Sequence, residues 1–379
     1  MHFKHRLPVL VDDLVHVIIE SDDHWWPRDF QRLALISSAW LTPVRKRLYA
    51  TPFLRSFRAC KLFARTLSEN TTLLSYLRGL DLRPIADGRR LLDAEEMQSL
   101  RFILALKGLQ AIAFGGDLAV SAERFIHVMV DTHAITTLHI DGYSSSDGHA
   151  LSTVHRLPSL EWDDVVAFRF PHLRQLTLSN LALTIHPPTL ERPSVMTRLT
   201  LSNVDIVDGF LPDLCSAAWD SLRVLKVVGK SAVDMDDHII SMLEACPGLE
   251  ELHYAATDMS TQPSIFDEEA PTCPNLQILS VSGFDVNPQT LDAIARACPK
   301  LAELAILGRI IRIAPDEWTL YVQSAKLPCL RRLVTPAGTN LPPFTFWSPD
   351  QRGALQHACQ SRGIQLGSGT VEIHSYALC

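Results

Sequence analysis

Apolar residues recur along most of this chain with the spacing Leu-x-x-Leu-x-Leu. Leu173, Leu176 and Leu178 form one clear copy, and Leu276 begins another. The other copies begin at Leu77, Leu109, Ile135, Met196, Leu222, Leu249 and Leu301, with a weaker one at Leu330. From Leu173 onward, successive copies begin 23 to 29 residues apart. The alternating apolar positions predict a short strand in each copy, and the regular interval predicts a repeat protein.

The segments between these strands have a helical pattern instead. Three of them place apolar residues at i, i+3, i+4 and i+7, in the groups 211/214/215/218, 239/242/243/246 and 291/294/295/298. Asp236, Asp237 and Asn287 stand where the helices begin, and Cys-Pro pairs at 246–247 and 298–299 end them. Each repeat is therefore predicted to be a strand, a loop and a returning helix, which stack into a parallel sheet covered by helices.

The first fifty residues predict three short helices. Leu7, Val11, Leu14, Val15 and Ile18 share one helical face, the group Phe30, Leu33, Ile36 and Trp40 shares another, and Pro43 opens a third segment that reaches Tyr49. An ordinary helical bundle that caps the repeats has the same pattern. Between this region and the repeats, 4-3-4-3 spacing from Phe53 to Leu67 predicts a connecting helix.

The order of residues in the N-terminal region resembles an F-box, the module that binds the Skp1 adaptor of cullin ubiquitin ligases. The resemblance lies in Leu7-Pro8 at the entrance, Ile36-Ser-Ser-Ala-Trp40 in the middle, and Arg47-Leu-Tyr49 at the close. It implies that the motif positions either contact Skp1 or hold the three helices together. Those positions are Leu7, Pro8, Leu14, Ile18, Leu33, Ile36 and Trp40.

The repeats resemble the leucine-rich repeats found behind F-boxes, in which the helix ends in Cys-Pro, as at Cys246, Cys273 and Cys298. The resemblance implies an α/β fold: a three-helix F-box, then an irregular solenoid with a parallel sheet on its concave side and helices on its convex side. The expected domains are 1–52 (F-box), 53–76 (connecting helix or cap), 77–339 (solenoid) and 340–379 (C-terminal cap). The turn position, commonly Asn or Cys, holds Leu181, Val204, Lys230, Thr257, Phe284 and Arg309, so no regular polar ladder is expected there.

Composition and charge restrict the partners. A net charge of -7 gives no basic field across the chain, which argues against nucleic acid as the main partner. Asp12 and Asp13 interrupt the apolar stretch near the start, and no other stretch is long enough to span a bilayer. We therefore expect no membrane insertion and a location in the cytoplasm, the nucleus or both. Eight scattered cysteines without a Cys-x-x-Cys pair agree with a reducing compartment.

The sequence carries no catalytic motif. Asp234-Met-Asp-Asp-His238 resembles a metal cluster, but its place at a helix entrance favours N-capping instead. The histidines lack zinc-ligand spacing, no glycine segment has the Lys of a phosphate loop, and no Gly-x-Ser-x-Gly elbow occurs. We therefore expect no catalytic residue, no metal and no cofactor.

The expected target-binding surface is the concave side of the sheet, where side chains alternate with the buried leucines. Its candidate residues are His139, Gln175, Thr177, Arg198, Thr200, Lys226, Glu251, His253, Ser280 and Glu303. A solvated face without a partner would have the same pattern. The mixed charges do not form the Arg cluster that a phosphorylated motif requires.

Together, the two resemblances imply a non-catalytic substrate receptor of an SCF-type ubiquitin ligase. The F-box would bind Skp1 and, through it, a cullin, and the repeats would bind a target protein. The alternative is a leucine-rich-repeat scaffold or inhibitor that binds a protein without Skp1. An enzyme is a third, more distant interpretation.

Overall fold

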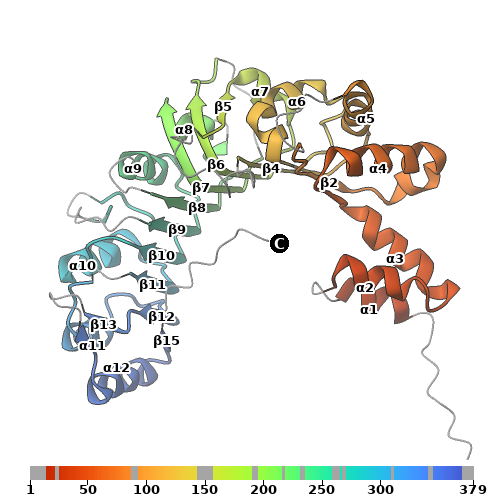
Figure 1. Ribbon diagram of the computed structural model, residues 1–379. Helices are drawn as coiled ribbons and strands as arrows, with labels where there is room; N and C mark the ends of the chain where they lie inside the picture. Colours follow the sequence, from red (N-terminus) through yellow and green to blue (C-terminus); the bar gives the residue numbers. More distant parts are fainter. Residues whose placement is uncertain are drawn as a thin grey trace, which may run out of the picture. The chain divides into compact units, whose positions relative to one another are not determined.

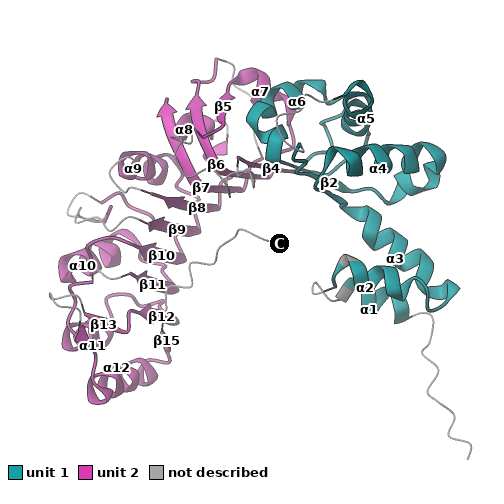
Figure 2. Cartoon of the chain, viewed as in Figure 1, with its two compact units in different colours: residues 1–135, 144–152 teal, residues 136–143, 153–379 magenta. Residues whose placement is uncertain are grey.

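The computed structural model describes residues 14–21, 25–86, 93–142, 157–189, 195–215, 218–230, 235–257, 265–266, 270–308, 311–339 and 345–368. The chain divides into two compact units, which Figure 2 shows in different colours. Unit 1 comprises residues 1–135 and 144–152, and unit 2 comprises residues 136–143 and 153–379.

Unit 1 begins with the helices α1 (Val15–Ser21), α2 (Pro27–Leu33) and α3 (Ser38–Ala50), which we call the N-terminal bundle. Strands and helices then alternate: β1 (Phe53–Leu54), α4 (Phe57–Glu69), the 3-10 helix η2 (Thr71–Tyr76), β2 (Gly79–Leu82), α5 (Ala94–Leu104), β3 (Ala111–Gly115), the 3-10 helix η3 (Gly116–Ser121) and α6 (Ala122–Val128). Strand β2 pairs in parallel with β1 on one side and β3 on the other.

The connecting helix predicted after the N-terminal bundle is α4, with one correction at its start. The helix begins at Phe57, where the Ser56 hydroxyl accepts a hydrogen bond from the Ala59 N–H (3.1 Å). Phe53, predicted to lie on the same helical face, belongs instead to strand β1 and is 44% exposed. The Asp81 N–H donates to the Pro52 carbonyl (3.0 Å), and this bond to β2 holds the segment extended.

Unit 2 contains most of the repeats (Figure 1). Its strands are β4 (Thr137–Asp141), β5 (Ser159–Trp162), β6 (Gln175–Ile185), β7 (Arg198–Asp208), β8 (Val224–Gly229), β9 (Glu251–Ala256), β10 (Ile278–Ser282), β11 (Glu303–Leu307), β12 (Arg332–Thr335), β13 (Gly338–Thr339), β14 (Thr345–Phe346) and β15 (Gln365–Ser368). Its helices are α7 (Asp164–Arg169), α8 (Leu211–Leu214), α9 (Asp236–Ala245), α10 (Pro288–Ala297), α11 (Pro315–Gln323) and α12 (Pro349–Ser361). The sheet runs β4-β6-β7-β8-β9-β10-β11-β12-β15 with parallel neighbours, and β5 also pairs with β6.

The repeat pattern is confirmed by the strands and by what they bury. Every predicted copy contains a strand, and its apolar positions are at most 5% exposed; Leu252, Leu279 and Leu304 are completely buried. Helices α9 and α10 end at Ala245 and Ala297, with Cys246 and Cys298 as their C-caps, as the Cys-Pro pairs predict. The fold is therefore mixed α/β, with helices along one side of the parallel strands of unit 2 (Figure 1).

Three features of unit 2 were not predicted. Strands β6 and β7 each extend over 11 residues because Leu181, Leu183 and Ile185 continue the alternation of buried positions in β6. Strand β5 pairs with this extension. Near the C-terminal end, β13 and β14 pair as an antiparallel ladder.

A short polar ladder also exists, contrary to the expectation from the turn positions. The Asn180 amide donates to Asp141 (2.9 Å), and the Asn203 amide donates to Asn180 (2.9 Å). These asparagines lie one residue before Leu181 and Val204, which the spacing had assigned to the turn. Both have positive φ, and Gly283 and Gly308 have positive φ at the equivalent positions of β10 and β11. Asn and Gly, the residues that adopt this conformation most easily, therefore occupy these four positions, whereas Ala256 of β9 lies in the same column without a positive φ.

Helix α12 and the final strand β15 form the C-terminal end of unit 2. Helix α12 starts after Ser348, whose hydroxyl accepts from the Gln351 N–H (3.3 Å). Arg362 then donates to the carbonyls of Val322 (2.7 Å) and Leu327 (3.0 Å), which fixes the end of α12 against the α11 region.

Candidate functional site

The N-terminal bundle has a small core of its own. Val15 and Ile19, one helical turn apart on α1, pack with Phe30 of α2 and Val44 of α3, and all four are buried. Leu33 and Trp40 lie partly buried against this core. Lys46 of α3 and Glu20 of α1 form an ion pair (3.0 Å) at the surface. The bundle is therefore held by its own side chains, but its helices are not divided as the spacing predicts. Ile36 lies in the turn after α2, Trp40 belongs to α3, and Pro43 lies inside α3 instead of opening a third segment, because the extended backbone of Ser37, the N-cap of α3, separates the two helices.

The bundle also presents large apolar side chains to solvent. Leu14 and Val17 of the α1 region are about half exposed, and Trp26, Leu35 and Ile36 are 74%, 86% and 62% exposed. Leu35 and Ile36 follow α2 directly, in the turn that leads to α3. A single exposed apolar residue is ordinary, but five of them between residues 14 and 36 make the bundle a candidate surface for another protein.

The residues that the resemblance assigned to Skp1 binding differ in their exposure. Leu14 and Ile36 are exposed, Ile18 is half-buried, and Leu33 and Trp40 contact the core of the bundle. Leu7 and Pro8 lie outside the described residues. The structure adds Val17, Trp26 and Leu35 to the exposed apolar set. Sequence reasoning missed them because helical spacing marks the residues that share a face but not which face is covered.

The second candidate surface is the side of the sheet of unit 2 that carries the residues alternating with the buried leucines. We call it the open face. The strand register aligns its predicted residues in two rows. Row one contains Gln175, Arg198, Val224, Glu251, Ile278 and Glu303, and row two contains His139, Thr177, Thr200, Lys226, His253, Ser280 and Ala305. All ten candidate residues therefore belong to one face, and each is partly or fully exposed.

Charge on the open face is concentrated over β7, β8 and β9. Lys226 of β8 lies directly opposite His253 of β9. Arg198 belongs to β7, the neighbour of β8 on the other side, and lies in row one. Glu251 precedes His253 by two residues, and its carboxylate lies 3.8 Å from the His253 Nε2 atom. Further along row one, Glu303 and Arg332 pair with each other (3.5 Å).

His253 is the member of this group whose titration is perturbed. Burial lowers its pKa below the usual value, and the positive charges of Lys226 and Arg198 lower it further, against the opposing effect of Glu251. The imidazole is therefore neutral at pH 7, with one nitrogen that donates and one that accepts.

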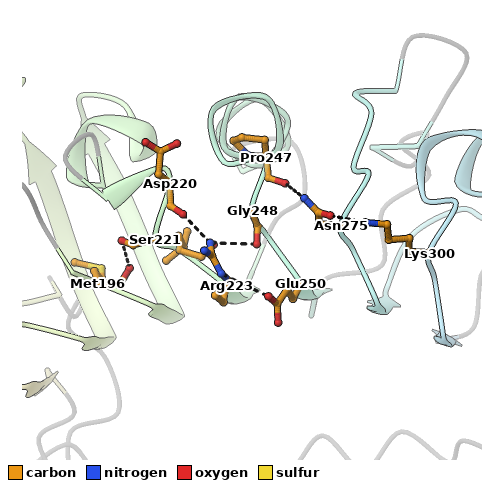
Figure 3. Close-up of polar contacts among 10 residues, drawn as sticks. Met196, Asp220, Ser221, Arg223, Pro247, Gly248, Glu250, Asn275 and Lys300 are labelled. Atoms are coloured by element: carbon orange, nitrogen blue, oxygen red, sulfur yellow. Dashed lines mark hydrogen bonds and ion pairs between the residues drawn. The ribbon is translucent and has the colours of Figure 1, made fainter.

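A chain of polar contacts along one edge of the sheet holds neighbouring repeats in register (Figure 3). The Ser221 hydroxyl donates to the Met196 carbonyl (2.8 Å), and the Arg223 guanidinium donates to the carbonyls of Asp220 (2.8 Å) and Gly248 (3.3 Å). Arg223 also lies 3.5 Å from the Glu250 carboxylate. Each contact but the one to Asp220 links one repeat to the next, so the edge fixes the spacing of the open-face rows.

The same edge continues over the next two repeats. The Asn275 amide donates to the Pro247 carbonyl (3.0 Å), and the Lys300 ammonium donates to the Asn275 side chain (2.8 Å), as Figure 3 shows. Asn275 and Lys300 therefore link neighbouring repeats through hydrogen bonds.

The acidic segment at the start of α9 is occupied by local contacts. Asp236 accepts from the Tyr254 hydroxyl, and the His238 Nδ1 atom accepts from the Leu211 N–H (3.4 Å). The expected N-cap is wrong in detail: Met235 holds that position, and Asp236 and Asp237 lie in the first turn, where they favour the helix dipole. Asp234 lies outside the described residues. Within the described ranges, no three His, Cys, Asp or Glu side chains gather closely enough to hold a metal ion.

Most of the cysteines that the structure describes are small core residues. Cys60, Cys215, Cys246, Cys273, Cys298 and Cys359 are buried, and Cys329 is exposed. Burial raises the pKa of Cys60 and of Cys246 to about 12, so neither forms a thiolate at neutral pH.

In the part of the chain that the structure describes, no helix has both the length and the apolar character needed to cross a bilayer. No known family model matches this chain, and a search of curated proteins also found no match. The N-terminal bundle and the open face are therefore the two candidate functional surfaces of this chain.

Proposed function

We propose that this chain is a substrate-recognition subunit of an SCF-type ubiquitin ligase. Its N-terminal bundle is an F-box that binds Skp1 and through it a cullin, and its leucine-rich repeats bind a target protein. The chain itself performs no covalent chemistry. Its effect comes from holding the target near the ubiquitin-conjugating enzyme that the ligase recruits.

The observation that carries the proposal is the exposed apolar set of the N-terminal bundle. The bundle has a complete core in Val15, Ile19, Phe30 and Val44, yet leaves Leu14, Val17, Trp26, Leu35 and Ile36 in solvent. Covering a fully exposed Leu or Ile contributes about 1.5–3 kcal/mol. These exposed side chains can pack against a partner protein, which a bundle that served only as a cap for the repeats would not require.

The repeats supply the second support. Unit 2 combines a helix-covered face, in which the leucines are buried, with an open face of polar and charged side chains. Parallel strands held in register by the edge contacts give this face a fixed arrangement of donors and acceptors. Such a surface is suited to holding a protein segment without reacting with it.

The test is co-expression with Skp1 followed by size-exclusion chromatography. The unmodified chain is expected to co-elute with Skp1, and Leu35→Asp and Ile36→Asp are expected to weaken the complex by tenfold or more, because each places a charge in the buried interface. Leu320→Asp is the matched control, since Leu320 of α11 is 64% exposed, like Ile36. It is expected to leave co-elution unchanged.

Two results would count against the proposal. Failure of the unmodified, folded chain to co-elute with Skp1 would favour the scaffold or inhibitor alternative. Equal loss with Leu320→Asp would show that a charge anywhere on the surface disturbs the complex. Circular dichroism of each variant separates loss of binding from loss of folding.

A further inference from the structure

Two cations of the open face lack an acidic partner within the described residues. Arg198 of β7 and Lys226 of β8 are both half-buried, and neither forms an ion pair there. By contrast, Arg223 pairs with Glu250 and Arg332 with Glu303. The strands are neighbours, about 4.8 Å apart, so the two cations can reach one common ligand.

Neutral donors surround these cations in row two. Thr177 and Thr200 align with Lys226 on one side, and His253 and Ser280 align with it on the other. All are half-buried. An anion placed beside Lys226 therefore meets hydroxyl and imidazole donors as well as positive charge, in surroundings where partial loss of water strengthens each hydrogen bond.

The local charge balance favours a ligand with one negative charge. Arg198 and Lys226 are positive, Glu251 is negative and His253 is neutral, so one positive charge is in excess. A phosphate dianion would face Glu251 with only one guanidinium nearby, whereas phosphate sites typically use clustered arginines. A single carboxylate matches the charge and the number of donors better.

We propose that the open face of unit 2 binds an acidic peptide segment, with one Asp or Glu side chain of that segment seated between Arg198 and Lys226. The inference rests on the proposed function, because it names the chemical class of target that the repeats would hold. Thr200 and His253 complete the carboxylate site from the neighbouring strands. Arg198 and Lys226 are thus specificity residues of a binding surface.

The experiment selects peptides on the full-length chain. A phage library of random dodecapeptides is panned on the immobilised chain without Skp1, and three enriched peptides are synthesised with a fluorescein label. We expect the selected pool to be enriched in Asp and Glu. Fluorescence anisotropy is expected to show a loss of affinity of about tenfold or more when the key acidic residue becomes Asn or Gln, or in Arg198→Gln or Lys226→Gln.

Arg332→Gln is the matched control, since Arg332 belongs to the same face but pairs with Glu303. It is expected to leave peptide affinity unchanged. A pool without acidic enrichment would overturn the proposal, and so would affinities that Arg198→Gln and Lys226→Gln leave intact. A peptide with phosphoserine at the key position that binds tenfold tighter than the acidic one would replace the carboxylate with a phosphate.

The pH dependence gives an independent measurement. The groups around His253 are Lys226 from β8, Arg198 from β7, Glu251 on its own strand and the uncharged Ser280 from β10. A bound carboxylate favours the protonated imidazole, so peptide affinity is expected to rise as the pH falls from about 8 to 6. His253→Gln is expected to remove this rise, and a rise that persists in that variant would contradict the assigned role of His253.

The peptide assay and the Skp1 assay test the two proposals separately. Peptide binding is measured without Skp1, and co-elution with Skp1 is measured without a peptide. A chain that binds Skp1 but selects no acidic peptide would refute this inference alone.

Discussion

His238 shows how the fold changes the chemistry of a single residue. Its ring meets that of Phe210 edge to face, with centroids 5.8 Å apart, and its Nδ1 atom accepts from the Leu211 N–H. Burial lowers the pKa of His238, and the nearby Asp237 opposes this shift more weakly. Both the hydrogen bond and the partial burial require the neutral imidazole, so protonation of His238 opposes the folded state.

The pKa of His238 makes the free energy of unfolding depend on pH. Because the folded pKa lies below the unfolded value of about 6.5, the unfolded chain takes up the proton first as the pH falls. The free energy of unfolding is expected to decrease between about pH 7.5 and 5.5, with a smaller decrease in His238→Gln. Urea denaturation of both proteins at several pH values measures the difference, and identical slopes would contradict it.

The thiols give a second prediction at this scale. Cys60 and Cys246 are buried, with pKa values of about 12, whereas Cys329 is exposed. Iodoacetamide at about pH 8 is expected to alkylate Cys329 in the folded chain and to spare Cys60 and Cys246. Peptide mass spectrometry identifies the modified thiols, and denatured protein, in which all three react, is the control.

At the scale of the elements, strands β6 to β11 share one register but differ in local detail. The turn column shows this well: Asn180 and Asn203 adopt a positive φ and join Asp141 in a ladder, while Gly283 and Gly308 adopt a positive φ without a side chain. A Cβ on Gly283 would lie 2.0 Å from the Ala256 carbonyl oxygen, so this position accepts only glycine.

Asn203 therefore has two separable contributions to stability. Asn203→Gly is expected to cost about 1 kcal/mol, because it removes the hydrogen bond to Asn180 but keeps the positive φ accessible. Asn203→Ala is expected to cost about 2 kcal/mol, because it adds the strain of an alanine in that conformation. Thermal denaturation of both variants checks the order, and an alanine variant as stable as the glycine variant would refute the argument.

Some features of the strands can be predicted from the sequence and others cannot. Leu252, Leu279 and Leu304 were predicted to be inward, and all are completely buried, because alternation within a strand is a local property. Phe53 was misassigned to a helix because its spacing to Phe57 is compatible with both structures, and only pairing with β2 decides between them. The ladder was missed because spacing located the turn one residue too late.

At the scale of the whole molecule, stability in unit 2 depends on neighbours. Each repeat buries its leucines against the next, and the edge contacts of Ser221, Arg223 and Asn275 tie consecutive repeats together. A chain organised in this way transmits damage to adjacent repeats first, since distant repeats share no contacts.

Leu279→Ala tests this directly. Leu279 of β10 is completely buried, and the change is expected to cost about 2–5 kcal/mol. Hydrogen exchange followed by mass spectrometry is expected to accelerate first in β9, β10 and β11, while β6 and β7 keep their protection. Uniform acceleration across unit 2 would show that it unfolds as one block.

The sequence alone determined the repeat, its strands, the residues they bury and the helical character of the region near the start, but not where its helices begin and end. These depend on the periodicity of apolar residues over a few neighbours, which the sequence displays directly. Only the tertiary structure decided which apolar residues of the N-terminal bundle remain exposed, where the turn column lies, and that Arg198, Lys226 and His253 meet on adjacent strands. These features join residues more than twenty positions apart, and strand register and burial bring them together.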